Sequence, residues 1–440
     1  MILFRYLIFF TILYFCPGGS FVRAEDWPRF RGLNGSGLSS GGEIPDRFDE
    51  STALWNVSIP GTGHGSPVVF GEHVYLLSAV PVPAVEPAEG GTPGKGKKGG
   101  KKKGNGAAPY QWQAICLDRE TGALVWKKDF KQQHFKGHRF NSAASSTAAV
   151  DEDQVVFAWG TAAQLTVVSL SHGGDLQWEK DLGPVVGGHG FGGSPVLFED
   201  LVVLNNDQEK QSGNLLALDA SSGDLAWTVK RQSERISYSV PCVYSVDGRD
   251  ALVFVNWQHG FTAIDPEVGS VIAEKSVFNL DTNERAISSP VVAGGLVIGT
   301  CGFTANPKHC VAMRLKDGLW EEVWRVERNV PHIPSVMPVG DRTFLIDDAG
   351  IATCLDTLTG EEHWRARIPG VEGSIFGSPV SDGEKILFLD ESGNAHLIAV
   401  SGEFKSLGAS ALGELCRSTP ALADGVVYIR TASGLRAYGK

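Results

Sequence analysis

The chain has 440 residues, of which 42% are hydrophobic, and it carries a formal net charge of −11 at pH 7. This hydrophobic fraction suffices for a folded core and is too low for a protein with many membrane spans. Six lysines lie together between residues 95 and 103, so the rest of the chain is more acidic still and lacks the basic face that nucleic-acid binding requires.

Residues 1–24 have the features of a signal peptide. Their apolar run, residues 7–15, is shorter than the roughly 20 residues that span a bilayer, and Ala24 ends a small-residue cleavage site. Cys16 does not suit a lipid anchor, because the bulky Phe15 precedes it. We therefore predict a cleaved signal peptide and a periplasmic or secreted protein that is not integral to the membrane.

The first repeated pattern is a small residue, then proline or its equivalent, then a run of mostly β-branched residues. The residues in the position before the proline are Ser66, Ser146, Ser194, Val240, Ser289, Ser335, Ser378 and Thr419. After the first interval the copies lie 41 to 49 residues apart, a period typical of four-stranded propeller blades. The chain should thus be an all-β, eight-bladed propeller of antiparallel blades, or seven-bladed if the copy after Phe376 forms no blade.

The second pattern is Leu-Asp-x-x-Thr-Gly-x-x-x-Trp, with serine for threonine in one copy. Its residues are Asp118, Gly122 and Trp126; Asp219, Gly223 and Trp227; and Asp356, Gly360 and Trp364. Asp can cap its own turn, Gly supplies the positive φ of the turn, and the Trp ring can fill the wedge between blades. A weaker copy has Ala273 in the tryptophan position.

These patterns resemble the tryptophan docking motif of the quinoprotein-like (PQQ-like) β-propeller superfamily, over about residues 51–440. Residues 26–32 also resemble the opening of exported propeller-repeat proteins of planctomycete-like bacteria. The expected organisation is therefore an N-terminal extension, residues 25–50, followed by the propeller. Residues 434–437 read as the third strand of the last blade, and residues 54–59 should complete it and remove an exposed edge.

Residues 80–109 interrupt the first blade between its second and third strands. They are rich in Pro, Gly and Lys, cannot bury a core and are predicted to be disordered. In an up-and-down blade, this loop emerges on the face where the chain enters the next blade. The segment is either a tolerated surface insertion or an electrostatic tether for an acidic surface.

Charged and aromatic residues occupy the connections that lead into the first strand of each blade. They are His64, His138, Arg139, His189, Tyr238, Arg285, His332, Phe376 and Arg417. First strands line the central channel, so we expect these side chains to gather at one mouth of it. They either bind an anion or a polar ligand there, or only satisfy backbone groups of the connections.

The resemblance implies a possible cofactor, PQQ, which quinoprotein dehydrogenases stack between a tryptophan and a disulfide of two adjacent cysteines. Those enzymes also hold calcium with Glu, Asn and Asp. This chain has no adjacent cysteines, no Cys-x-x-Cys-His and no His-Glu-x-x-His. We therefore expect no catalytic residue, no metal and no cofactor, because a fold does not carry its relatives' activity.

Two further expectations concern the cysteines and an irregular tryptophan. Cys116, Cys310 and Cys354 lie in apolar strands and should be small core residues, and only Cys301 and Cys310 look like a hairpin pair. Trp257, which does not follow the repeat, is the first candidate for an exposed ring.

The sequence thus predicts a non-catalytic extracytoplasmic scaffold or binding module with a protein partner in the cell envelope. It is similar in architecture to the BamB-type accessory proteins of outer-membrane assembly. The alternatives are a PQQ-dependent oxidoreductase and a channel module that binds a small ligand.

Overall fold

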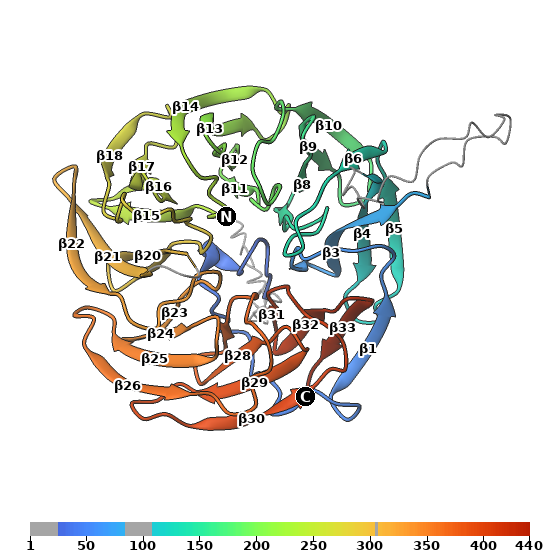
Figure 1. Cartoon of the computed structure of the whole chain (residues 1–440). Coiled ribbons are helices and arrows are strands. Elements are labelled where there is room, and N and C mark those ends of the chain that lie inside the picture. Colours follow the sequence, from blue (N-terminus) through green and yellow to red (C-terminus); the bar gives the residue numbers. More distant parts are fainter. Residues whose placement is uncertain (1–24, 84–107, 304–306) are drawn as a thin grey trace, which may run out of the picture.

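The computed structural model describes residues 25–83, 108–303 and 307–440. The described residues form a ring of eight antiparallel blades around a central channel (Figure 1). This confirms the predicted eight-bladed propeller, and the alternative with seven blades is wrong. The described part of the chain contains no helix that is long and apolar enough to cross a membrane.

The first four blades follow one another in chain order from the innermost to the outermost strand. Blade 1 contains β2 (Val68–Phe70), β3 (His73–Pro81), β4 (Ala108–Asp118) and β5 (Leu124–Asp129), with β6 (Gln133–Phe135) added to β4. Blade 2 contains β7 (Ala149–Val150), β8 (Val155–Gly160), β9 (Leu165–Leu170) and β10 (Leu176–Asp181). Blade 3 contains β11 (Val196–Phe198), β12 (Leu201–Asn206), β13 (Gln211–Asp219) and β14 (Leu225–Ser233). Blade 4 contains β15 (Cys242–Val246), β16 (Arg249–Asn256), β17 (Gly260–Ile264) and β18 (Val271–Lys275).

The other four blades complete the ring. Blade 5 contains β19 (Val291–Ala293), β20 (Leu296–Cys301), β21 (His309–Lys316) and β22 (Leu319–Val326). Blade 6 contains β23 (Met337–Val339), β24 (Arg342–Ile346), β25 (Ile351–Asp356) and β26 (Glu362–Arg367). Blade 7 contains β27 (Val380–Ser381), β28 (Lys385–Leu389), β29 (Asn394–Ala399) and β30 (Ser406–Ala411). Blade 8 contains β31 (Ala421–Ala423), β32 (Val426–Arg430), β33 (Gly434–Tyr438) and β1 (Ala53–Ser58).

The burial of each strand explains its sequence pattern. The middle strands β8 and β9 are buried along their whole length, because both of their faces pack against neighbouring blades. The outer strand β10 alternates, and its Trp178 is buried between exposed neighbours. Continuous apolar runs therefore mark the middle strands, and alternation marks the outer ones.

The two ends of the propeller meet in blade 8, as predicted. The N-terminal strand β1 pairs antiparallel with β33, with Trp55 opposite Ala437 (Figure 1). The Tyr438 ring packs edge-on against Phe48 at 5.3 Å between ring centroids. This pairing supplies the fourth strand of blade 8 and ties the two ends of the propeller together.

A docking tryptophan joins six of the eight blades to the next one along the ring; the outer strands of blades 4 and 7, β18 and β30, carry none. The indole N–H of Trp126 donates to the His172 carbonyl at 2.7 Å, and that of Trp178 donates to the Ala220 carbonyl at 2.8 Å. The same bond is made by Trp55 to Arg119, Trp227 to Pro266, Trp324 to Thr357 and Trp364 to Ser401. The motif glycines Gly122, Gly223 and Gly360 lie against the rings of Trp55, Trp178 and Trp324. In each motif copy, the glycine therefore packs against the preceding blade and the tryptophan docks on the following blade.

Blade 4 departs from the repeat, and blade 5 compensates. Ala273 of β18 stands in the position of the docking tryptophan. Trp320 of β22 in blade 5 fills the space that the missing ring would occupy, and its indole N–H donates back to the Ala273 carbonyl at 3.3 Å. Its ring stacks on Tyr244 of blade 4, with ring centroids 6.1 Å apart. Trp257 is buried and bonds to the Asn279 carbonyl, so the expectation of an exposed ring there is wrong.

The first repeated pattern forms a ring of hydrogen bonds around the channel, which we call the hydroxyl belt. In each bond, a backbone N–H donates to the side-chain hydroxyl of the equivalent residue in the next blade, at 2.9 to 3.2 Å. The hydroxyls belong to Ser66, Thr147, Ser194, Ser289, Ser335, Ser378 and Thr419. The belt is broken only at Val240, which has no hydroxyl to offer Ser194. In seven of the eight blades, the serine or threonine of the pattern therefore accepts a hydrogen bond from the backbone N–H of the preceding blade.

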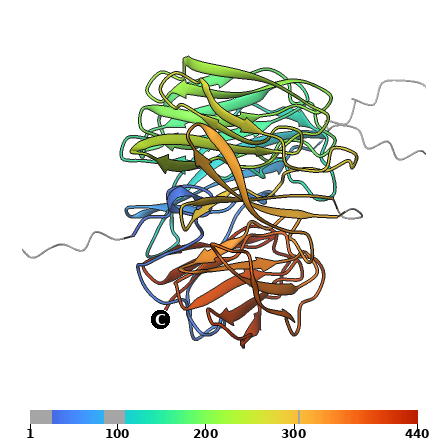
Figure 2. The same ribbon diagram turned by 90° about the vertical axis from the view of Figure 1, so that its left-hand side faces the viewer.

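The N-terminal extension lies across one end of the channel. Its 3₁₀ turn η1 (Leu33–Gly35) lies on one face of the disc in the edge-on view (Figure 2). Asn34 exchanges two hydrogen bonds with the Val243 backbone, and Arg29 donates to the Pro241 carbonyl at 2.7 Å. Arg31 is fully buried and donates to the Val336 carbonyl at 2.9 Å. These contacts hold the segment on innermost strands from several blades.

The six described cysteines are free and buried. Thr300 and Cys310 lie opposite each other in the β20–β21 ladder, so their side chains are on the same face of the blade. Cys301 follows Thr300, so it points to the other face and belongs to a different core cluster from Cys310. Cys301 and Cys310 are therefore no hairpin pair, because register places the two thiols on opposite faces, and Cys310 is a core residue as predicted.

Two segments with sequence-based predictions lie outside the described residues: the signal peptide, residues 1–24, and most of the insertion, residues 84–107. The flanking strands β3 and β4 are longer than expected and reach Pro81 and Ala108. β4 pairs there with β6, which belongs to the connection into blade 2. The ends that flank residues 84–107 therefore lie on the face where the chain enters successive blades.

Candidate functional site at the channel mouth

One cavity lies where the connections between blades meet, and we call it the mouth cavity. It has a volume of about 570 Å³. The residues that line it are His64, His138, Arg139, Phe140, Asn141, Ser145, His189, Gly192, Tyr238, Arg285, Ile287, Phe303, His332, Ile333, Phe376 and Arg417. All seven residues predicted for the channel mouth (His64, Arg139, His189, Tyr238, Arg285, His332 and Arg417) are among them. The cavity brings these residues together, and ligand binding stays a prediction.

The mouth cavity continues into a narrower space of about 120 Å³ inside the hydroxyl belt. Phe30, from the N-terminal extension on the far side of the ring, lines this inner space. Since the extension lies across that end, the cavity is a cup entered from the mouth face. The sequence did not indicate this closure, because residues 25–50 carry no repeat.

Several polar atoms in the wall of the cup are buried and make no hydrogen bond among the described residues. They include the Tyr238 hydroxyl, Nε2 of His332, Nδ1 of His189 and Nε of Arg285. Buried polar groups are normally paired, so this unused capacity indicates a place for a polar ligand or for water.

Ion pairs at the mouth neutralise part of its charge. Arg417 pairs with Glu391, Lys308 with Asp348, and Arg235 with Glu209. Within the described part of the chain, Arg285 forms an ion pair only with the already paired Glu209, at 3.4 Å between Nη2 and Oε1. Arg139 makes no ion pair among the described residues, and its guanidinium lies 4.3 Å from the Phe140 ring centroid. The mouth therefore retains positive charge from these two arginines.

The mouth histidines are held in their neutral form. Burial lowers the pKa of His64 to about 4, and the charges of Arg417 and Arg430 lower it further. Burial also lowers the pKa of His189 to about 4, assisted by Arg285 and His138. The rings of His138 and His189 are 4.0 Å apart between centroids. At neutral pH these rings therefore act as hydrogen-bonding groups rather than as cations.

Two phenylalanines form the apolar edge of the cup. Phe140, from the connection into blade 2, packs on Phe376, from the connection into blade 7, at 5.6 Å between centroids. Arg417 lies over the Phe376 ring at 4.9 Å and donates to the Arg139 carbonyl at 2.8 Å. The connection that carries Arg139 and Phe140 thus reaches across the mouth. Sequence analysis missed Phe140, because its position does not follow from the repeat.

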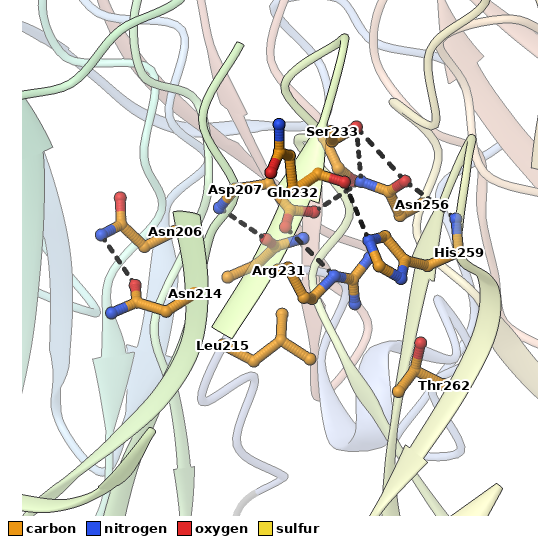
Figure 3. A network of polar contacts seen from close by, with 12 residues as sticks. Asn206, Asp207, Asn214, Leu215, Arg231, Gln232, Ser233, Asn256, His259 and Thr262 are labelled. Atoms are coloured by element: carbon orange, nitrogen blue, oxygen red, sulfur yellow. Dashed lines mark hydrogen bonds and ion pairs between the residues drawn. The ribbon is translucent and has the colours of Figure 1, made fainter. Parts of the chain in front are cut away.

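A buried polar network supports the cup wall at the seam between blades 3 and 4 (Figure 3). Asp207 accepts a hydrogen bond from Asn256 at 2.8 Å and lies 3.2 Å from Nε of Arg231, with both ion-pair partners almost fully buried. His259 contacts Glu274 at 3.0 Å and the Gln232 carbonyl at 3.1 Å. The network fixes the ends of β12, β14 and β16, from which the chain leads to Glu209 and Arg235.

The lining of the mouth cavity does not match a calcium–quinone site. Among the described residues it contains no carboxylate, no tryptophan and no cysteine. Calcium prefers carboxylate and carbonyl oxygens, and the arginines would repel it. In the described ranges no group of three His, Cys, Asp or Glu side chains is placed to hold a metal ion.

A family model described as outer membrane protein assembly factor BamB matches residues 113–322 and 318–438. BamB from Moraxella catarrhalis has a similar structure, with a TM-score of 0.55 and 13% identity over 74% of this chain and 91% of that chain. A europium-containing methanol dehydrogenase gives a TM-score of 0.53 and 11% identity over 93% and 90%. The quinohemoprotein alcohol dehydrogenase from Comamonas testosteroni gives 0.51 and 12% over 95% and 81%. At these identities the likeness shows the fold alone. No curated protein matches the sequence.

Proposed function

The chain belongs to the family described as outer membrane protein assembly factor BamB, and on this premise we propose that it is a non-catalytic binding scaffold. We place it outside the cytoplasm, on account of the predicted signal peptide. Its working surface is the mouth face of the propeller, and its partner is a component of the cell envelope. The observation that carries the proposal is the cup at the channel mouth, which is open on one face and lined by unpaired polar groups.

The architecture suits binding better than turnover. The hydroxyl belt and the tryptophan contacts hold the blades in fixed positions, so the connections present a rigid rim. The ionisable groups that line the cup are arginines, a tyrosine and neutral histidines, and among the described residues its lining holds no carboxylate of the kind that binds calcium. This composition also disfavours the alternative of a PQQ-dependent oxidoreductase.

Site-specific photo-crosslinking in the native envelope tests the proposal. A photoreactive residue replaces Phe140, which is 41% exposed on the mouth face. The matched control replaces Leu319, which is 69% exposed and follows the turn at Asp317–Gly318 on the opposite face. We expect a discrete crosslinked partner from position 140 and none from position 319.

Two results would overturn the proposal. One is a set of crosslinks that is the same from both positions. The other is turnover: oxidation of methanol by the purified protein after addition of PQQ and calcium would establish the enzyme instead.

A further inference from the structure

We infer that the mouth cavity binds a carboxylate, or an oxyanion of the same shape, through Arg285, Tyr238 and His332. The inference rests on the proposed binding function and names the chemical class that the cup recognises. It depends on three observations: a buried cation with free donors, two neighbouring polar atoms that also lack partners, and an apolar wall beside them.

Arg285 is the centre of the site. Its side chain is 7% exposed, and its Nε has no partner among the described residues. Its one ion-pair partner among the described residues is Glu209, which is in close contact with Arg235 and accepts a further bond from the Gly188 N–H at 2.9 Å. Arg285 is therefore a buried guanidinium whose donors are largely unused, which is costly unless an acceptor arrives. A carboxylate matches the planar fork of arginine.

Tyr238 and His332 lie on either side of Arg285 around the ring. They belong to the connections into blades 4 and 6, and Arg285 belongs to the connection into blade 5. All three side chains line the mouth cavity, and the charge of Arg285 acts on both neighbours. The Tyr238 hydroxyl and the His332 Nε2 are buried without a partner in the described structure. The Tyr238 hydroxyl can donate a hydrogen bond to an anion. His332 can do the same when its neutral ring carries the proton on Nε2.

The charges around the site favour an anion over a cation. The nearby carboxylates Glu209, Glu391 and Asp348 each have a basic partner of their own. The buried Glu284, next to Arg285 in the chain, does not line the cavity and lies 3.6 Å from Nε2 of His309, whose pKa it raises. Arg139 and Arg285 are left over, while the neutral mouth histidines add donors without adding repulsion. A ligand with one negative group would offset this excess.

The remaining wall is apolar and selects what the carboxylate is attached to. Phe140, Phe303, Phe376, Ile287 and Ile333 line the same cavity. Its volume of about 570 Å³ lies in the usual range for small-ligand sites, roughly 300 to 1,000 Å³. The ligand is therefore an apolar or aromatic body with one anionic head. A small aromatic acid and the C-terminal residue of a partner chain both have this chemistry.

Calorimetry with matched acids and amides tests the site. Benzoate and benzamide have the same ring and differ in the charge of the head group. At pH 7 and low salt we expect the intact protein to bind benzoate at least about tenfold more tightly than benzamide. In Arg285→Gln that preference should disappear, and in Tyr238→Phe it should fall several-fold. The control Arg314→Gln removes an exposed arginine of β21, far from the cup, and should leave both affinities unchanged.

A second comparison distinguishes the two sources of the carboxylate. The peptide Ala-Ala-Phe is measured with a free C-terminus and with an amidated one. Tighter binding of the free peptide than of benzoate identifies a chain terminus, and the reverse identifies a small acid. Equal affinities for acid and amide in both pairs overturn the inference, as does an unchanged benzoate affinity in a folded Arg285→Gln variant.

The outcome can be separated from the proposed function. If Phe140 crosslinks to a partner and Arg285→Gln has no effect on that crosslink or on benzoate binding, the scaffold stands and the carboxylate site falls. If benzoate binds through Arg285 and position 140 yields no partner, the site stands and the protein scaffold falls.

Discussion

Trp227 of blade 3 and Gly269 of blade 4 fit together so closely that a Cβ atom on Gly269 would lie 2.6 Å from Cγ of the indole ring. Gly269 also has a φ of 67°, which side chains other than glycine adopt with strain. The indole N–H meanwhile bonds to the Pro266 carbonyl in the same turn. One position therefore satisfies a backbone requirement and a packing requirement together.

Gly269→Ala should destabilise the propeller by about 3 kcal/mol, because it combines a steric clash with backbone strain. The matched control is Gly248→Ala, at a φ of 75° with no neighbouring atom within 4 Å of a Cβ. It should cost only the backbone strain, about 1 kcal/mol. Urea unfolding of both variants measures the difference, and equal losses would show that the contact with Trp227 contributes nothing.

Ser335→Ala should break one bond of the hydroxyl belt and leave the Ser289 N–H, which donates to Ser335 Oγ at 3.0 Å, buried without an acceptor. We expect a loss of roughly 1 to 3 kcal/mol in the free energy of unfolding. Ser335→Thr keeps the hydroxyl, as Thr147 and Thr419 do in their blades, and should retain most of the stability. A loss of the same size in both variants would mean that side-chain volume, rather than the hydrogen bond, matters there.

Stability should fall on acidification from about pH 6.5 to pH 4. The pKa of His64 is about 4 in the folded chain, against an ordinary value of 6.5, so the unfolded chain binds a proton first in this interval. Protonation therefore favours unfolding below pH 6.5 and has no such effect above it. His64→Gln should flatten the dependence of the melting temperature on pH, whereas His363→Gln, at an exposed position of β26, should not. An unaltered profile in His64→Gln would exclude the buried ring as a source.

Cleavage after Ala24, as the sequence predicts, would produce an α-ammonium at Glu25. The Glu25 backbone nitrogen lies 2.7 Å from Oδ1 of Asp424, which also pairs with Arg119 at 2.6 Å. The new charge should therefore form an ion pair, and the protein that starts at Glu25 should melt at a higher temperature than the same protein with an acetylated N-terminus. Mass spectrometry of the exported protein checks the cleavage site. A mass that starts elsewhere, or equal melting temperatures, would contradict the prediction.

The repeat made most of the fold predictable, because each blade obeys the same local physics. The motif around Trp126 and Trp364 encodes a turn, a strand and a blade contact in ten residues. Trp324 docks in the same way and was missed, because the tight turn at Asp317–Gly318 lacks the usual spacing and Trp320 precedes it. The carbonyl that accepts a hydrogen bond from a docking tryptophan belongs to the neighbouring blade, as Thr357 does for Trp324. One copy of the motif, read alone, does not include this acceptor.

The residues of the candidate site that lie in the blade connections were also predictable, because the connections follow the repeat. Every connection enters its blade from the same face, so residues such as His64 and Arg417 had to converge. The reach of Phe140 across the mouth and the closure of the cup by Phe30 depend on segments outside the repeat. The positions of these side chains are set by long-range contacts, such as those of Asn34 with Val243, that leave no local signal in the sequence.

The pairing of β1 with β33 also sets an order of assembly. These strands are the first and the last of the propeller in the chain, so blade 8 cannot form until β33 has been synthesised. The first strand of the propeller must therefore stay unpaired until the seven blades between it and β33 have been synthesised. The N-terminal extension contacts blade 1 at Val69 and blade 4 at Val243, but also Ser381 of blade 7. Closing the ring and completing the seal of the channel are therefore late steps in the making of this molecule.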